Sequence, residues 1–445
     1  MVATAETNSK VLRKPRTTAR ELWAWYLYDF GNSAYAAVVL LAVYATYFKQ
    51  QVVGGAEGSR LWGLAVALAM FVVALLSPIL GAIADFSGTK KRFLLFFTSM
   101  SCFFTALLFF VGPGDVWMGM LFFILAEIGY RAAQVFYNAL LTEVATPEDM
   151  GRVSGIGWAI GSAGGVVCLL IILPLIMFVG GTLIVRLSLV ITSAFFALFT
   201  IPLFRWLRER AEPQPLPEGE SYLSFGFKQT FKTLRASRDY KEFVKFVIAF
   251  LVYNDGVMMA LNFASIIGAV LFGMTQQDLI IFMIIVQITN VLGAYLLGLL
   301  SERWSVKRSL IVSVLLMVGV VTWMYFTRTV FEFYLVGAVA GLAMAGVQSV
   351  SRAMVGVLIP PKRSAEFYGF FAVAGRTSSF IGPAVFGWVA AEAALRYEAQ
   401  GFAALLAEQL GQRLGILSIG VFLLIGLGLL LWVNEKKAKV MMAED

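Results

Sequence analysis

Long apolar runs follow one another along almost the whole sequence and are separated by short polar stretches. A helix needs about 20 predominantly apolar residues to cross the ~30 Å hydrocarbon core of a bilayer. Charged residues make up 14% of the chain, whereas about 25% is usual in a soluble domain. The sequence therefore predicts an all-α polytopic membrane protein with twelve transmembrane helices, at residues 23–48, 60–84, 92–111, 116–142, 153–179, 183–206, 242–272, 277–300, 308–327, 332–359, 366–391 and 414–433.

Lysine and arginine gather in alternate loops, a bias that marks the cytoplasmic loops of membrane proteins. With the N-terminus placed in the cytoplasm, the opposite loops hold only Lys49, Arg60, Arg186, Arg328, Arg396 and Arg413. We therefore expect an even number of spans and both termini in the cytoplasm. The net charge of +8 is attributed to basic residues that collect in these cytoplasmic loops, and no nucleic acid partner is expected.

The longest polar interval, 207–241, predicts a cytoplasmic linker between two six-helix halves, 23–206 and 242–433. A basic N-terminus (1–22) and a basic tail (434–445) complete the domain plan. A basic amphipathic stretch from Phe227 to Lys245 is expected to lie on the anionic inner leaflet, with a binding partner as the alternative.

The two halves repeat each other in part. Gly81, Asp85 and Lys90 recur with the same spacing as Gly298, Glu302 and Lys307. Three further residues recur at one common offset: Gln134, Gly155 and Gly161 match Gln348, Gly369 and Gly375. Duplicated units of this kind predict two pseudo-symmetric bundles with a binding site near the midplane between them.

Six ionisable residues interrupt the apolar runs: Asp29, Glu127, Arg131, Asp255, Arg352 and Arg376. Charges within a membrane must be paired or must face a water-filled cavity. Glu127 and Arg131 are spaced for an i,i+4 ion pair. This pair either only holds its helix in place or binds a zwitterion, with Arg131 on the carboxylate and Glu127 or Asp255 on the amine. The predicted substrate-binding set is Asn32, Tyr35, Glu127, Arg131, Gln134, Asp255 and Gln287.

Asp29 lies about six residues inside Trp23, which is ~9 Å of helix. Arg352 and Arg376 also lie toward the cytoplasmic ends of their spans. We therefore interpret these three residues as a gate or proton-coupling group, in which Asp29 pairs with Arg376 or Arg352 when the cytoplasmic side is closed. Direct contact of Asp29 with substrate is the alternative.

Several signatures are missing from the sequence. It contains no histidine, which excludes histidine metal ligands, histidine proton relays and a Ser-His-Asp triad. It has no GxxxxGK[ST] motif for ATP. Cys102 and Cys168 lie in apolar runs and are expected to be reduced packing residues. We expect no enzyme activity, no cofactor and no metal.

Four stretches resemble known transporters. GAIADFSGTKKR (81–92) resembles the loop 2–3 signature of the major facilitator superfamily, although Phe86 stands where a basic residue usually follows the acid. Three others resemble the vacuole-effluxer-like branch, which includes an autophagy-related vacuolar amino-acid exporter of fungi: WYLYDFGNSAYAAVV (25–39), NALLTEVATPEDMGRVSGIGWAIGSAGG (138–165) and YGFFAVAGRTSSFIGP (368–383). The resemblance implies that Asp85, Arg92, Glu302 and Arg308 latch the cytoplasmic helix ends. The alternative is that the basic residues only fix the topology.

These observations favour a secondary transporter that works by alternating access on a small polar solute. Amino-acid efflux, with proton coupling as an option, is what the resemblance implies. The alternatives are another cargo (a peptide, sugar or drug), or a membrane sensor or lipid scramblase that moves no soluble solute. The expected partners are the solute, protons and the lipid bilayer. A monomer is expected in a bacterial inner or plasma membrane, or in the vacuolar membrane of a fungus.

Overall fold

The computed structural model describes residues 17–86, 88–145, 150–210, 219, 221–236, 240–359, 371, 374–375, 380–435 and 437. This part of the chain is helical almost throughout and contains no strand. Eleven of its helical segments are long and apolar enough to cross a membrane. The protein is therefore a multi-pass integral membrane protein, as the sequence predicted.

The first span is composite. Thr18 caps α1 (Ala19–Tyr35) through a capping box, in which its side chain accepts from Glu21 N and Glu21 accepts from Thr18 N. The chain then continues through η1 (Ala36–Ala42), α2 (Tyr44–Tyr47) and η2 (Phe48–Val53), so that two π-helical segments interrupt the α-helix. Such segments are rare and occur frequently at functional sites. The sequence predicted a single uninterrupted helix here.

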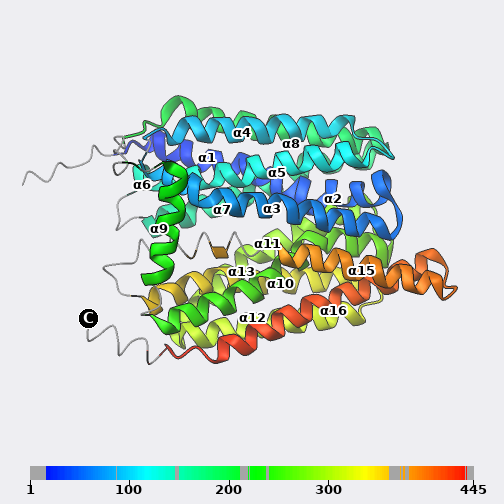
Figure 1. Cartoon of the computed structure of the whole chain (residues 1–445). Helices are drawn as coiled ribbons and strands as arrows, with labels where there is room; N and C mark the ends of the chain where they lie inside the picture. The colour runs from blue at the N-terminus through cyan, green and yellow to red at the C-terminus, as the bar shows by residue number, and fades with distance from the viewer. Residues whose placement is uncertain are drawn as a thin grey trace, which may run out of the picture.

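The remaining helices form two layers, of which the first holds the N-terminal helices (Figure 1). Together with the first span, it comprises α3 (Gly55–Phe86), α4 (Lys90–Leu107) with η3 (Leu108–Phe110), α5 (Val116–Ala139), α6 (Leu141–Val144), α7 (Met150–Phe178) and α8 (Gly181–Trp206). The second layer comprises α10 (Lys241–Phe272), α11 (Gln276–Arg303), α12 (Val306–Phe326), α13 (Val330–Leu358), α15 (Ile381–Ala399) and α16 (Ala404–Leu431). We call these two layers the first and the second bundle.

Glycine contacts show that the two bundles repeat one packing scheme. In the first bundle α1 packs on α8, and a Cβ at Gly31 would come within 2.9 Å of Phe199 Cβ. In the second bundle α10 packs on α16, and a Cβ at Gly256 would come within 3.1 Å of Leu423 Cγ. Small residues let helix backbones approach closely in membranes. The α10 helix runs unbroken through Gly256, so this glycine serves close packing of α10 on α16.

The two ends of the bundles differ in charge. The end where α1, α4, α10 and α12 begin carries Lys90, Lys91, Lys307 and Arg308, and we call it the basic end. Helix α9 (Tyr222–Ala236), which falls within the interval expected to be a linker, lies across this end and packs on α3 (Figure 1). Ion pairs hold the first bundle together here: Lys90 Nζ lies 3.0 Å from Glu143 Oε1, and Arg210 Nη2 lies 2.8 Å from Glu21 Oε2.

Two predicted spans differ from the structure. The helix expected at 366–391 is observed as α15, which ends only at Ala399, and most of the residues between 360 and 379 lie outside the described part. The last helix begins at Ala404, ten residues before its predicted start. Both extensions are rich in alanine and leucine, which are strong helix formers, but they also carry charges. Hydropathy therefore marks them as loops although they are helical.

Candidate functional site

An ion pair lies in the middle of α5. Arg131 Nε donates to Glu127 Oε1 at 2.7 Å, and the two side chains are 24% and 1% exposed. The i,i+4 spacing on one helix dictates this contact. Within the described part of the chain, the Nη groups of Arg131 form no hydrogen bond. The guanidinium is thus accessible and has its bidentate donor edge available for a carboxylate.

Two tyrosines pack beside this ion pair. Tyr35 of α1 stacks on Tyr130 of α5 with ring centroids 4.6 Å apart, and Arg131 Cζ lies 5.2 Å from the centre of the Tyr130 ring. The sequence did not single out Tyr130, although its position three residues after Glu127 puts it on the same helix face. The structure thus brings Tyr35, Glu127 and Arg131 together, with half-buried Gln134 one turn further along α5.

Three buried polar atoms of this cluster have no hydrogen-bond partner in the described structure: Asn32 Oδ1, the Tyr35 hydroxyl and Glu127 Oε2. Buried polar groups are nearly always bonded, so each exception points to a missing water, ion or ligand. Two of the three atoms are acceptors only, and the third is a hydroxyl that can donate. The cluster therefore offers a carboxylate-binding guanidinium beside unfilled acceptors.

Asp29 lies one helical turn from this cluster, toward the basic end. Its Oδ1 accepts from Asn32 Nδ2 at 3.4 Å, and its Oδ2 would lie 2.5 Å from a Cβ at Gly161, so a side chain at this point of α7 would displace the Asp29 carboxylate. Among the described residues it forms no ion pair, and a pair with Arg352 is absent from this conformation. Arg376 lies outside the described residues. Pairing of Asp29 in a closed basic end therefore stays a prediction.

The second bundle contributes buried polar groups of its own. Asp255 is buried in α10 against the start of α15, where a Cβ at Gly382 would lie 2.9 Å from Asp255 Oδ1, and this oxygen has no hydrogen-bond partner among the described residues. The neighbouring Asn254 accepts from Gln348 Nε2 at 3.0 Å. Gln287 of α11 reaches the place where α1 and α7 meet, with Nε2 3.5 Å from a Cβ built at Gly165. Gln287 is therefore a predicted second-bundle residue that directly approaches α7 of the first bundle.

The predicted latch is only partly visible. The side chains of Asp85 and Glu302 lie outside the described part of the structure. Arg92 and Arg308 are exposed at the basic end, and neither forms an ion pair with a described residue. Their latching role stays a prediction.

The end opposite the basic end is sealed between the bundles. Lys49 of η2 forms an ion pair with Glu408 of α16, and these side chains are only 4% and 13% exposed. Gln412 Nε2 donates to Ser59 Oγ at 2.7 Å, and Trp62 Nε1 donates to Asn262 O at 3.0 Å, both in buried positions. By contrast, the two ion pairs described above for the basic end lie within the first bundle. The conformation is therefore closed at the opposite end.

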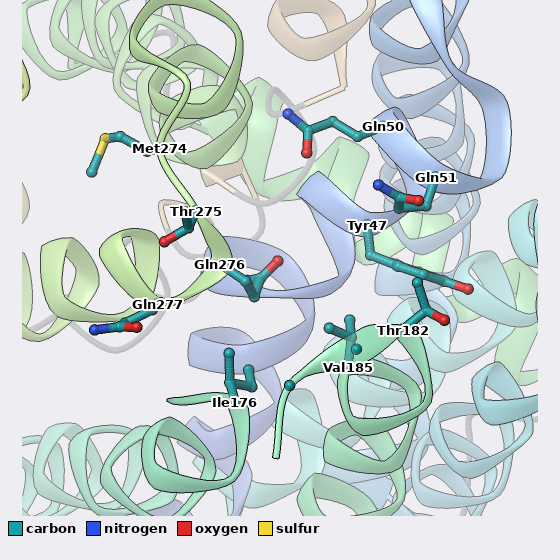
Figure 2. A pocket seen from close by; sticks show the side chains of 12 residues that line it. Tyr47, Gln50, Gln51, Ile176, Thr182, Val185, Met274, Thr275, Gln276 and Gln277 are labelled. Atoms are coloured by element: carbon teal, nitrogen blue, oxygen red, sulfur yellow. The ribbon is translucent and has the colours of Figure 1, made fainter. Parts of the chain in front are cut away.

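A pocket of about 380 Å³ lies at this sealed end, between the end of the first span, the α7–α8 turn and the α10–α11 turn (Figure 2). Its polar lining consists of amides and hydroxyls from both bundles: Tyr47, Gln50, Gln51, Thr182, Thr275, Gln276 and Gln277. Gln276 Nε2 also donates to Ala42 O, which joins the second bundle to η1. None of the lining residues carries a charge.

A family model described as "Vacuole effluxer Atg22 like" matches residues 62–149 and 143–443, which is most of the chain. The chain belongs to this family. Among relatives of this vacuole-effluxer-like protein, the uncharacterized MFS-type transporter YxiO of Bacillus subtilis (strain 168) is 31% identical over 372 residues, covering 81% of this chain and 86% of the relative. Autophagy-related protein 22 of Yarrowia lipolytica is 25% identical over 414 residues, covering 74% of this chain and 69% of the relative.

Solved structures of transporters share the fold. A bacterial homologue of the human lysosomal transporter Spinster, in an inward-facing and unoccupied conformation, superposes with a TM-score of 0.69 at 15% identity over 95% of this chain and 97% of that chain. The nucleoside transporter NupG gives a TM-score of 0.65 at 14% identity over 93% of this chain and 99% of that chain. The vacuole-effluxer-like chain is therefore a transporter of the major facilitator superfamily, and the prediction of this superfamily and branch is confirmed.

Proposed function

We propose that this transporter exports a small zwitterionic solute, an amino acid, by alternating access. The observation that carries the proposal is the ion pair in α5, where Arg131 is bonded to Glu127 through Nε alone and keeps its Nη donors accessible. The family description, which names a vacuole effluxer, and the relatives named autophagy-related protein 22 support efflux as the direction.

The buried polar atoms that have no hydrogen-bond partner in the described structure suggest how an amino acid would bind. Arg131 would hold the carboxylate through its two Nη groups while Glu127 Oε1 stays on Nε. The ammonium group has three donors and no acceptor, which suits the unfilled acceptors Glu127 Oε2 and Asn32 Oδ1. The Tyr35 hydroxyl would donate a hydrogen bond to the carboxylate. Gln134 and Gln287 would line the remaining space, and Asp255 is the alternative partner of the amine.

The sealed end then marks the exit. With the basic end assigned to the cytoplasm, the solute would enter from the cytoplasmic side and reach Arg131. Release would require the Lys49–Glu408 and Ser59–Gln412 contacts to separate. Segment η1 lies between Tyr35 and this seal, so its π-helical turns are placed to change helical register as the bundles rock. Asp29 and Asp255 are the candidates to carry a coupled proton, because protonation removes the charge of each.

Counterflow tests the cargo. Purified protein in liposomes loaded with one unlabelled solute would be given the labelled solute, across a panel of amino acids, amino-acid amides and esters, peptides and sugars, with and without a pH gradient. We expect exchange of free amino acids and loss of exchange when either the carboxylate or the amine is blocked. Arg131→Gln should abolish this exchange, whereas Arg396→Gln, which removes an exposed arginine at the sealed end, should not. Sugar exchange without amino-acid exchange would refute the cargo and leave the transporter family intact.

One observation favours a different cargo. The pocket at the sealed end offers only uncharged amides and hydroxyls, a lining that suits a sugar or another neutral polar solute. The same panel separates the two ideas, because a neutral cargo would exchange independently of Arg131. Binding of a solute without any exchange would instead favour the sensor.

A further inference from the structure

A second pocket, of about 690 Å³, lies at the basic end of the second bundle, away from the ion pair in α5. It is formed by the start of α12 and the end of α16, which run along the outer edge of this bundle (Figure 1). The lining includes two basic residues, Lys307 and Arg308, two largely exposed tryptophans, Trp304 and Trp432, and one acid, Glu435.

The equivalent position in the first bundle, at the start of α4, shows that an anionic group can bind there. Lys90 at the start of α4 corresponds to Lys307 at the start of α12 in the repeat. In the first bundle, the carboxylate of Glu209 accepts from Lys90 N at 2.6 Å and from Lys91 N at 3.2 Å. Lys91 Nζ meanwhile donates to Phe204 O in the last turn of α8 and to the carbonyl of Leu207, which follows this helix. An anionic group of the chain itself thus occupies the start of α4.

The start of α12 in the second bundle has a similar arrangement, but its glutamate makes a longer contact. Lys307 Nζ donates to Leu431 O of α16 at 3.0 Å, a contact similar to the one that Lys91, the residue after the counterpart of Lys307, makes with the end of α8. Glu435 approaches Lys307 N only at 3.4 Å, beyond the usual range of an N–H···O bond, and Arg308 is exposed beside it. Two cations against one acid leave this pocket with an excess of positive charge. The start of α12, unlike that of α4, therefore has room for an anion from outside the chain.

We propose that this pocket binds the phosphate of an anionic phospholipid headgroup in the leaflet at the basic end. Arg308 and the N–H group of Lys307 supply charge-assisted donors, and Glu435 is the intramolecular competitor that the phosphate displaces. A lipid fits better than a soluble phosphate because Trp304 and Trp432 are the side chains that anchor proteins at headgroup depth. Ile311 and Leu431 add apolar surface for the glycerol and upper acyl region.

Native mass spectrometry of the intact protein, titrated with phosphatidylglycerol, tests the proposal. Arg308→Gln should raise the dissociation constant about fivefold, the expected contribution of one basic residue. Glu435→Gln should lower it, because the competing carboxylate is gone. Arg92→Gln is the matched control, since it removes an exposed arginine from the basic end of the first bundle and should leave the dissociation constant unchanged. Phosphatidylcholine should bind weakly to all four proteins.

Three results would overturn the proposal. Equal weakening by Arg92→Gln and Arg308→Gln would show a diffuse attraction to the basic end. Unchanged binding in both Arg308→Gln and Glu435→Gln, with thermal unfolding as in the unmodified protein, would show that lipid sits elsewhere. Displacement of phosphatidylglycerol by an equal concentration of inorganic phosphate would assign the pocket to a soluble anion.

Discussion

Helices α5 and α13 occupy equivalent places in the two bundles, yet they use these places differently. At the offset that relates Gln134 to Gln348, Glu127 corresponds to Gly341 and Arg131 to Ala345. In α5 the two positions form the ion pair of the candidate site. In α13 the glycine lies against α11, and Asn290 Nδ2 donates to Gly341 O at 3.3 Å. The same position is a charged site in one bundle and a helix contact in the other.

The two bundles therefore share the contacts that hold the helices together, but the charged pair is present in only one of them. Both bundles keep the scaffold contacts, such as Gly31 and Gly256 on the neighbouring helix. The paired charges lie on α5, while α13 has small residues and the neutral Gln348 at these positions, and its Arg352 lies nearer the basic end. In our proposal the first bundle therefore holds the charges of the solute. The second bundle moves against it.

Arg131→Ala should have the largest effect. It removes the carboxylate-binding group and leaves Glu127 charged and buried without its partner, which costs about 3–5 kcal/mol of stability. Solute affinity should fall about ten- to a hundredfold. Counterflow and thermal unfolding in detergent measure the two effects. The double variant Glu127→Gln/Arg131→Gln should regain most of the stability but none of the exchange, and recovery of exchange would show that the pair only holds α5 in place.

Glu408→Gln should come next, because it breaks a contact between the bundles. Lys49 would remain nearly buried without its counter-charge, which penalises the sealed conformation. Distances between spin labels placed on the two bundles at the sealed end should shift toward longer values. Glu398→Gln, which removes an exposed acid at the same end, should leave them unchanged. An unaltered distance distribution in Glu408→Gln would mean that the seal does not depend on this pair.

The sequence could predict contacts within one helix but not contacts between helices. The Glu127–Arg131 pair was predictable because one helix and its periodicity determine the contact. The stacking of Tyr35 on Tyr130 and the pairing of Lys49 with Glu408 depend on how separate helices meet, which no local pattern encodes. The helical extension of α15 to Ala399 was missed for another reason, since hydropathy measures burial in lipid and not helix formation.

Gly341→Ala should destabilise the protein by about 1–3 kcal/mol, the usual effect of overpacking. Its Cβ would collide with Thr289 Oγ1 and with Val286 O, and a backbone carbonyl cannot move aside cheaply. Gly319→Ala is the matched control, because a Cβ there meets nothing within 4 Å and alanine favours the α12 helix by about 0.5–1 kcal/mol. Thermal unfolding of both variants decides the matter. Equal stability would refute tight packing at the α13 counterpart of Glu127.

The smallest effect is expected where the bundles are most alike. A Cβ at Gly31 meets Phe199 Cβ at 2.9 Å and Phe196 O at 3.0 Å, whereas a Cβ at Gly256 meets only side-chain atoms of α16, the nearest at 3.1 Å. Side-chain ends can rotate away, but a backbone carbonyl cannot. Gly31→Ala should therefore be less stable than Gly256→Ala by about 1 kcal/mol, within the range for mild overpacking. If thermal unfolding showed Gly256→Ala to be the less stable variant, contact distance alone would not explain how well each bundle accepts the added methyl group. The flexibility of the α10–α16 contact would then have to be measured by hydrogen exchange.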